Sequence, residues 1–235
     1  MQDQHISSAY DRDLEKLITL IMQMGGLVED AILQAAKALT ERDMELVDKV
    51  RKGDKVIDQL EHRINEEAAR IIALRAPVSK DLRAILAVLR LAASLERMGD
   101  YAKNIAKRTS ALVELQPVSG ADAGLKRMAR EVQGMLKDVL DAYARNDADL
   151  AEDVRQRDAE VDQMYNAMFR EFLTFMLEDP RNITACMHLH FMAKNIERMG
   201  DLTTNMAEQI IYSVTGEMPD EGREKSDRTA YFSTE

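Results

Sequence analysis

Pairs of carboxylates spaced four residues apart have the clearest chemical potential in this sequence. Glu96 and Asp100 form one pair within the motif Glu-Arg-Met-Gly-Asp. The same motif recurs in the second half of the chain, where Glu197 and Asp201 form another pair. Residues four apart lie on one face of a helix, so each pair holds two like charges together. Such oxygen-rich groups suit hard divalent cations and iron, and they therefore predict metal binding.

A second set of acidic residues lies upstream of each motif. Asp54, Asp58 and Glu61 share one side of a helix, beside its apolar stripe. In the second half, Asp158 and Asp162 repeat this arrangement. If the helices that carry these residues pack antiparallel against the helices that carry the motifs, the two acidic sets converge. The sequence thus predicts one acidic site in each half of the chain.

A structural role for the acidic pairs is the main alternative. Acidic pairs on helices are often solvated or paired with basic residues, and Arg97 and Arg198 lie next to the motif glutamates. The recurrence of both sets favours metal binding, although a duplication also retains structural residues. His62 and His190 lie on the acidic faces but do not recur, so we favour a hydrogen-bonded or exposed role for each over metal ligation.

The elements that must position these residues are long amphipathic helices. Hydrophobic residues make up 46% of the 235 residues, Trp is absent, and the chain has only 10 Gly and 4 Pro. Apolar residues recur at the three-and-four spacing of an amphipathic helix. Residues that commonly cap helix N-termini precede several of these stretches, at Ser8, Asp43, Asp147 and Asp179. The patterns predict helices near 9–41, 43–75, 79–115, 121–146, 148–178 and 181–215.

The second half of the chain repeats the first. The acidic sets recur in the same order, and Asn104, four residues after Asp100, has its counterpart in Asn205. The segment 116–120 holds the main cluster of helix-breaking residues between the halves. The predicted fold class is therefore all-α, with two tandem three-helix bundles built from six long antiparallel helices. We expect bundles over 1–117 and 118–216, followed by a flexible C-terminal tail over 217–235.

Glycines interrupt two of the predicted helices, at Gly99 and Gly200 within the repeated motif. A glycine inside a helix costs about 1 kcal/mol relative to alanine. Such glycines typically allow close helix approach, and nothing around them resembles a loop that cradles phosphate.

The charge balance excludes several classes of partner. Lys and Arg number 32 against 42 Asp and Glu, and the resulting net charge of -10 disfavours binding to nucleic acid and anionic membranes. No run reaches the ~18 apolar residues of a membrane span, and the N-terminus lacks the features of a secretory signal. The single cysteine, Cys186, fits a reducing compartment and has no catalytic motif around it. We therefore expect a cytoplasmic protein.

Further short motifs accompany the acidic residues: Met24-Gly25-Gly26, Gly53-Asp54 and Ser79-Lys80-Asp81-Leu82-Arg83. Together with the doubled Glu-Arg-Met-Gly-Asp motif, they resemble the PhoU family of phosphate regulators over about residues 8–216. The resemblance implies a cytoplasmic, often dimeric protein that represses phosphate-starvation genes. It would act with the ATPase subunit of a phosphate ABC transporter and with a phosphate-sensing membrane histidine kinase. It would reach membranes only through these protein partners.

The resemblance also implies a set of metal ligands, because some members of the family bind multinuclear metal clusters through such acidic residues. The implied ligands recur in both halves and are Asp54, Asp58, Glu96, Asp100, Asn104, Asp158, Asp162, Glu197, Asp201 and Asn205. The metals expected are Mg, Mn, Zn or Fe. The second half has Tyr165 in place of Glu61 and Asn182 in place of Asp81, so we expect the two sites to differ in affinity or metal.

Two other functions remain open at the level of the residues. A carboxylate-bridged metalloenzyme would use the same acidic residues, but the sequence lacks the Glu-x-x-His motif of di-iron bundles and a positioned acid, base or nucleophile. A purely structural helical scaffold would bind no metal and would tolerate changes to the acidic residues. We favour a non-catalytic negative regulator that acts as an adaptor between transporter and kinase.

Overall fold

The chain folds into long α-helices joined by short connections. The computed structural model describes residues 2–118 and 120–219, with side chains described from Tyr10 onward. The α-helices are α1 (Gln2–Glu41), α2 (Met44–Arg75), α3 (Ser79–Val113), α4 (Ala121–Arg145), α5 (Ala148–Glu178) and α6 (Ile183–Thr215). A 3-10 turn, η1 (Pro180–Asn182), precedes α6, and the described residues contain no β-strand. The predicted all-α fold with six long helices is confirmed.

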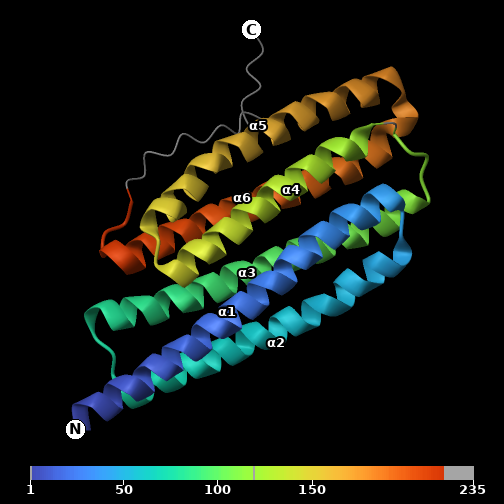
Figure 1. The fold of residues 1–235 in the computed structure, drawn as a ribbon. Helices are drawn as coiled ribbons and strands as arrows, with labels where there is room; N and C mark the ends of the chain where they lie inside the picture. The colour runs from blue at the N-terminus through green and yellow to red at the C-terminus, as the bar shows by residue number, and fades with distance from the viewer. Residues whose placement is uncertain (1, 119, 220–235) are drawn as a thin grey trace.

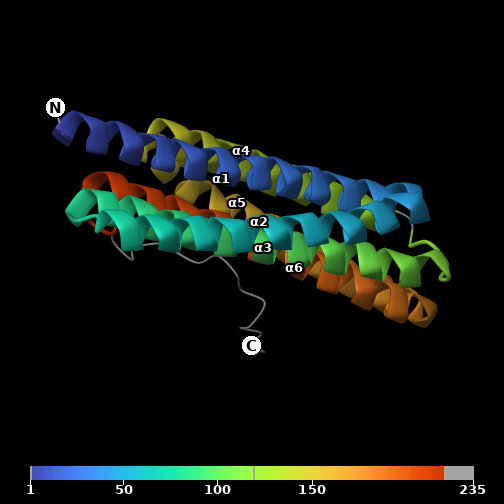
Figure 2. The same cartoon turned by 90° about the horizontal axis from the view of Figure 1, so that it is seen from below.

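The helices lie side by side in an elongated arrangement, with α1–α3 in one half and α4–α6 in the other (Figure 1). The central helices are α1, α3, α4 and α6, because α1 packs on α4 and α3 packs on α6 across the two halves. Among the described residues, α2 packs only on α1 and α3, while α5 packs on α4, α6 and η1. The two outer helices therefore lie at opposite edges of the molecule, and α2 is in front when it is seen from below (Figure 2).

One contiguous apolar core runs through both halves. On α1, Met24 and Val28 are fully buried, and so are Met128 and Val132, their counterparts in the repeat on α4. Equivalent residues of the two halves are therefore buried alike, so the repeat is seen in the core packing as well as in the sequence. The division of the chain between 117 and 118 stays a prediction, and residues 220–235 of the expected tail lie outside the described residues.

Helix α1 contains a long apolar stretch. Over Tyr10–Glu41 this helix is long and apolar enough to cross a membrane, because an 18-residue window within it has a mean hydropathy of 1.3. Among the described residues it is the one helix that meets this test. The core helix of a soluble protein meets the same test. Leu17, Ile21 and Ile32 of α1 are buried against the other helices, so one apolar face of this helix belongs to the core, while Leu27 and Leu33 are exposed.

Aspartate caps fix several helix starts. The carboxylate of Asp43 accepts hydrogen bonds from the backbone N–H groups of Glu45 and Leu46, and Asp147 accepts one from Leu150. Both caps were predicted and are confirmed, because an N-cap carboxylate satisfies otherwise unpaired N–H groups. Asp179 also caps, but it begins η1, and α6 starts at Ile183 rather than near 181.

The predicted start of the first helix is wrong. The helix begins at Gln2 instead of near residue 9, and Ser8 is a helical residue rather than a cap. Neither Gly nor Pro interrupts residues 2–8, so nothing in the chain stops the helix there.

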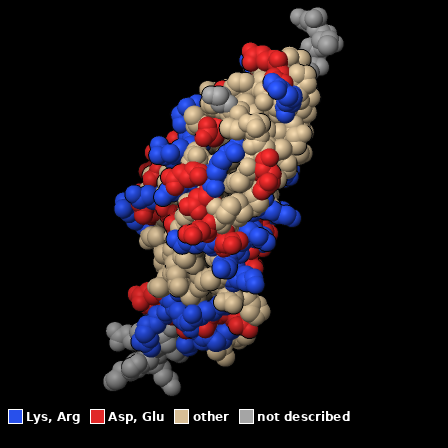
Figure 3. Space-filling model, turned by 90° about the vertical axis from the view of Figure 1, so that its right-hand side faces the viewer, with Lys and Arg blue, Asp and Glu red and all other residues tan. Residues whose placement is uncertain are grey.

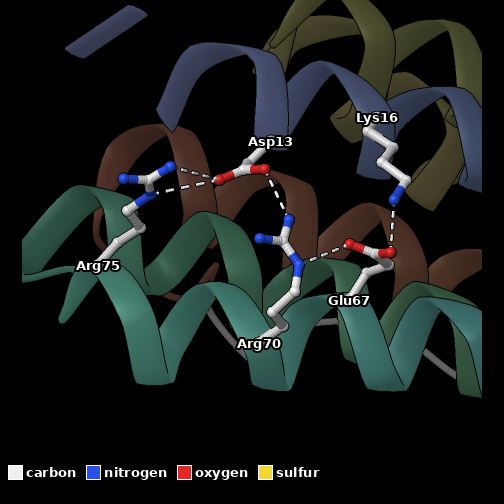
Figure 4. Close-up of polar contacts among 5 residues, drawn as sticks. All are labelled: Asp13, Lys16, Glu67, Arg70 and Arg75. Atoms are coloured by element: carbon white, nitrogen blue, oxygen red, sulfur yellow. Dashed lines mark hydrogen bonds and ion pairs between the residues drawn. The ribbon is translucent and has the colours of Figure 1, made fainter. Parts of the chain in front are cut away.

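Charged side chains of both signs are interspersed over the face of the molecule shown in Figure 3. One ordered network of such charges joins α1 to α2 (Figure 4). Asp13 accepts hydrogen bonds from Arg70 at 2.6 Å and from Arg75 at 3.3 Å. Arg70 also donates to Glu67 at 3.0 Å, and Glu67 in turn pairs with Lys16. The hydrogen bond from Arg70 holds the pKa of Asp13 below its ordinary value.

We expect Asp13→Asn to lower the free energy of unfolding by about 1 kcal/mol at neutral pH, because the amide keeps the shape but loses the charge. Since folding lowers the pKa of Asp13, its stabilisation is present above the ordinary value of 3.8 and is lost as the pH falls through the folded pKa. Urea unfolding of both proteins at several pH values measures the difference. The exposed Asp11→Asn is the matched control, and an equal loss in both variants would contradict the network's role.

Candidate functional site

The first acidic cluster lies along the seam between α2 and α3. It comprises Asp54, Asp58 and Glu61 on α2 with Glu96 and Asp100 on α3. Asp54 is only 5% exposed, Glu61, Glu96 and Asp100 are partly buried, and Asp58 is exposed. The two acidic sets predicted to converge in the first half therefore meet at one seam, which runs from a buried carboxylate to the surface.

A lysine neutralises the buried end of the first acidic cluster. Lys103 Nζ donates to Asp54 Oδ2 at 2.5 Å and to Asp100 Oδ1 at 2.6 Å, so one ammonium joins the two helices. Partial burial works against the charged form of Lys103, but the hydrogen bonds to Asp100 and Asp54 outweigh it and raise the lysine's pKa. The ammonium therefore stays charged over the accessible pH range.

The remaining carboxylates of the first acidic cluster are less well compensated. Although Asp58 is exposed as a residue, neighbouring protein atoms partly desolvate its carboxylate, and this, followed by repulsion from Asp54, raises the pKa of Asp58 above its ordinary value. Burial, followed by repulsion from Asp100 and Asp58, likewise raises the pKa of Glu96. One lysine thus leaves excess negative charge at this seam, which a bound cation would relieve.

The second acidic cluster occupies the corresponding seam between α5 and α6. Asp158 and Asp162 on α5 are 3% and 4% exposed, and Glu197 on α6 is 6% exposed, whereas Asp201 is partly buried. This cluster is therefore more enclosed than the first. Burial is the main cause of the raised pKa of Glu197, and Asp201 and Asp162 add to it by repulsion.

In the second acidic cluster a different lysine pairs with a carboxylate. Lys194 Nζ donates to Glu197 Oε1 at 2.9 Å and lies 4.9 Å from the centroid of the Tyr165 ring. In the repeat, Lys194 corresponds to Ala93 and Lys103 corresponds to Thr204. Each half therefore places its lysine on a different turn of the helix that carries the motif. The two halves, which were expected to differ in their sites, therefore also differ in the position of the lysine that offsets the negative charge.

One carboxylate oxygen in each cluster is buried without a hydrogen bond. These are Asp54 Oδ1 in the first acidic cluster and Glu197 Oε2 in the second. Buried polar atoms without partners are uncommon and costly, and a carboxylate oxygen is a suitable ligand for a hard cation. Among the described residues no three His, Cys, Asp or Glu side chains are gathered as a ready metal cage. In this arrangement the two lysines supply the positive charge, and the donor chemistry fits a cation that would replace it.

The two asparagines among the expected ligands, and the two histidines considered with them, have other surroundings. Asn104 lines a cleft between α3 and α6, and Asn205 is exposed on α6. His62 is exposed and lies 3.4 Å from Glu66, while His190 packs against the aromatic rings of Tyr165, Phe169 and Phe191. The structure thus gives each histidine surroundings other than a metal cage.

Sequence reasoning missed the two lysines of the acidic clusters. A signal was present, because Lys103 follows Asp100 by three residues and Lys194 precedes Glu197 by three. Residues three apart on a helix are neighbours and can pair. The bond from Lys103 to Asp54 on α2 could not be foreseen, since it depends on how the helices are packed.

The motif glycines let the paired helices approach closely. A Cβ atom at position 99 would lie 3.1 Å from Cδ1 of Ile57 on α2. A Cβ atom at position 200 would lie 3.2 Å from Cγ1 of Val161 and 3.3 Å from Oδ1 of Asp158 on α5. The predicted role of these glycines in close helix approach is confirmed, and each lies next to a buried aspartate of its cluster.

The fold and the two seams define a class of all-α proteins in which a three-helix unit is repeated, each unit with an acidic cluster at its outer seam. A family model described as the PhoU domain matches residues 21–109 and again residues 125–210. The chain therefore belongs to the PhoU family, as its sequence motifs indicated.

Similar proteins cover nearly the whole chain. A phosphate-specific transport system accessory protein PhoU homolog from Rhizobium meliloti is 45% identical over 98% of this chain and 97% of its own length. The corresponding protein from Caulobacter vibrioides is 46% identical over 95% and 97%. The crystal structure of PhoU from Pseudomonas aeruginosa matches with a TM-score of 0.85 at 38% identity, over 88% of this chain and 100% of that one.

We expect Gly200→Ala to lower the free energy of unfolding by about 1 kcal/mol. The methyl group would press on Val161, whose branched side chain is stiff, and this outweighs the gain in helix propensity. At Gly53 on α2 a Cβ atom would meet nothing within 4 Å, so Gly53→Ala should stabilise by up to ~1 kcal/mol. Thermal and urea unfolding measure both variants. Equal stabilisation by the two substitutions would refute the close-approach role.

Proposed function

We propose that this protein is a negative regulator of phosphate uptake and of phosphate-starvation genes. The observation that carries the proposal is the similarity along almost the full chain to relatives named phosphate-specific transport system accessory proteins. A relative of known structure from Streptococcus pneumoniae, 30% identical over 90% of this chain, is named a phosphate transport system regulatory protein. The proposed role is non-catalytic.

The proposed mode of action is that of an adaptor. The protein would contact the ATPase subunit of a phosphate ABC transporter and a phosphate-sensing histidine kinase from the cytoplasm, as a homodimer. The long helices support this role, because they expose extended side-chain surfaces while one core holds both halves together. Attachment to membranes would occur through the protein partners, since a net charge of -10 repels anionic lipid.

We further propose that the acidic clusters bind Mg, Mn, Zn or Fe. The buried, unpartnered oxygens of Asp54 and Glu197 support this, as does the repulsion that raises the pKa of Asp58 and Glu96. A bound cation would supply positive charge and cancel the repulsion between carboxylates on paired helices. The protein's own contribution is to fix the relative positions of α2 and α3, and of α5 and α6. The outer surfaces of these helices would then present a defined shape to a partner.

Asp100→Asn and Asp201→Asn should each lower the amount of metal bound, because each removes a charged ligand from one cluster. Metal analysis and calorimetric titration of the metal-free protein with Mn²⁺ measure the effect. A loss of about tenfold in affinity at the altered site is expected, which corresponds to about 1.4 kcal/mol. Asp153→Asn, at an exposed position of α5, is the matched control. If wild type stays metal-free in excess Mg, Mn, Zn and Fe, the clusters are structural.

Deletion of the gene should switch phosphate-scavenging functions on in high phosphate, because the proposed role is repression. Alkaline phosphatase activity in replete and starved cells measures this directly. A plasmid copy of the wild-type protein should restore repression, and an Asp153→Asn copy should do so equally. Alkaline phosphatase that stays normally responsive to phosphate in the deletion strain would rule out the proposed function.

A further inference from the structure

A cleft between α3 and α6 is lined by basic side chains in this otherwise acidic protein. Its volume is about 770 Å³, and it also contacts α5 through Tyr165. Lys107 and Arg108 of α3 face Lys194 and Arg198 of α6 across it, and none of its lining residues is an aspartate or glutamate. The cleft thus gathers four cationic side chains from both halves of the repeat. We call it the basic cleft.

The cations of the basic cleft are largely uncompensated. Among the described residues, neither Lys107, Arg108 nor Arg198 forms an ion pair with a carboxylate, whereas Lys194 pairs with Glu197 at 2.9 Å. His188 and His190 line the same cleft, and the Nδ1 atom of each is buried without a hydrogen bond. Like charges held around one concave space repel each other. A bound anion would therefore be attracted by several groups at once.

Aromatic rings hold two of these cations without cancelling their charge. The guanidinium of Arg108 lies 4.4 Å from the centroid of Phe191, and Lys194 lies 4.9 Å from that of Tyr165. A cation–π contact restricts a long side chain while its N–H groups remain able to donate to an anion. Part of the entropic cost of ordering the side chains on binding is therefore already met in the fold.

The basic character is not imposed by the duplicated fold. In the repeat, Glu208 occupies the position of Lys107, and Gln209 occupies that of Arg108. The equivalent region on the other side of the α3–α6 contact therefore carries an acidic and a neutral residue instead of two cations. Lys194 aligns with Ala93, and only Arg198 has a cationic counterpart, in Arg97. Three of the four cations of the basic cleft are therefore particular to one of the two related regions.

We propose that the basic cleft binds a polyvalent phosphate anion with linked phosphate groups, such as an inorganic polyphosphate or the phosphate chain of a nucleotide. Arginine forks and lysine ammonium groups are the usual ligands of phosphate oxygens. A volume of about 770 Å³ is in the range of small-molecule sites and exceeds the need of a single phosphate group. The inference stands on the cleft alone and does not depend on the proposed regulatory role.

Calorimetric titration of the metal-free full-length protein with sodium tripolyphosphate tests the proposal. ATP, orthophosphate, citrate and an acidic Glu-rich peptide are titrated in parallel. The variants Lys107→Gln and Arg198→Gln alter exposed cations of the cleft and leave the acidic clusters intact. Arg130→Gln and Lys137→Gln, at exposed positions of α4, remove the same charge elsewhere and are the matched controls. Thermal unfolding establishes that all variants remain folded.

We expect saturable binding of one tripolyphosphate per chain, weakened about tenfold by each cleft variant and unchanged by each control. Tighter binding of ATP than of tripolyphosphate would identify a nucleotide as the source of the phosphate chain, and equal or weaker binding would identify inorganic polyphosphate. The proposal is overturned if tripolyphosphate does not bind, or if cleft and control variants lose affinity equally. It is also overturned if orthophosphate, citrate or the acidic peptide binds as tightly as tripolyphosphate.

Discussion

Carboxylates that lie in a helix seam require compensating positive charge or protons, and this requirement governs both outer seams of the molecule. Removing a charged carboxylate from water costs several kcal/mol unless a counter-charge or hydrogen bonds offset it. Asp54 and Glu197 are nearly buried, and each is paired through one oxygen with a lysine while its other oxygen has no hydrogen bond. Each acidic cluster and its lysine are therefore coupled electrostatically.

The two halves share one arrangement of helices but differ in the side chains at their acidic clusters. Both motif glycines bring an outer helix close to its partner, so a buried aspartate lies beside the motif in each half. The compensating lysines occupy different turns, however, and Tyr165 stands where the first half has Glu61. The second acidic cluster is the more enclosed of the two, and three of the four cations of the basic cleft have no cationic counterpart in the repeat. The two halves therefore share one fold while differing in the charged residues at their seams.

The fold and the convergence of the acidic residues were largely predictable, because both depend on spacing along helices. The three-and-four spacing of apolar residues, with capping residues such as Asp43, predicted the helices. The recurrence of the Glu96 and Asp100 pair in the second half predicted one acidic site in each half. The first helix start was misplaced, since Ser8 has the residue type of a cap but no breaker precedes it. Contacts between distant segments, such as Lys103 with Asp54 or Arg108 with Phe191, were not predictable, because they depend on the rotation of each helix about its axis.

The role of Lys103 is tested most directly by comparing wild type with Lys103→Gln in two titrations, urea unfolding without metal and Mn²⁺ binding by calorimetry. If the lysine stands in for a cation, the variant loses about 1–2 kcal/mol of stability without metal and binds Mn²⁺ more tightly, because the competing ammonium is gone. Lys137→Gln, at an exposed position of α4, should change neither quantity. A Lys103→Gln protein that is at least as stable as wild type without metal and shows no gain in Mn²⁺ affinity would show that the lysine does not stand in for a cation.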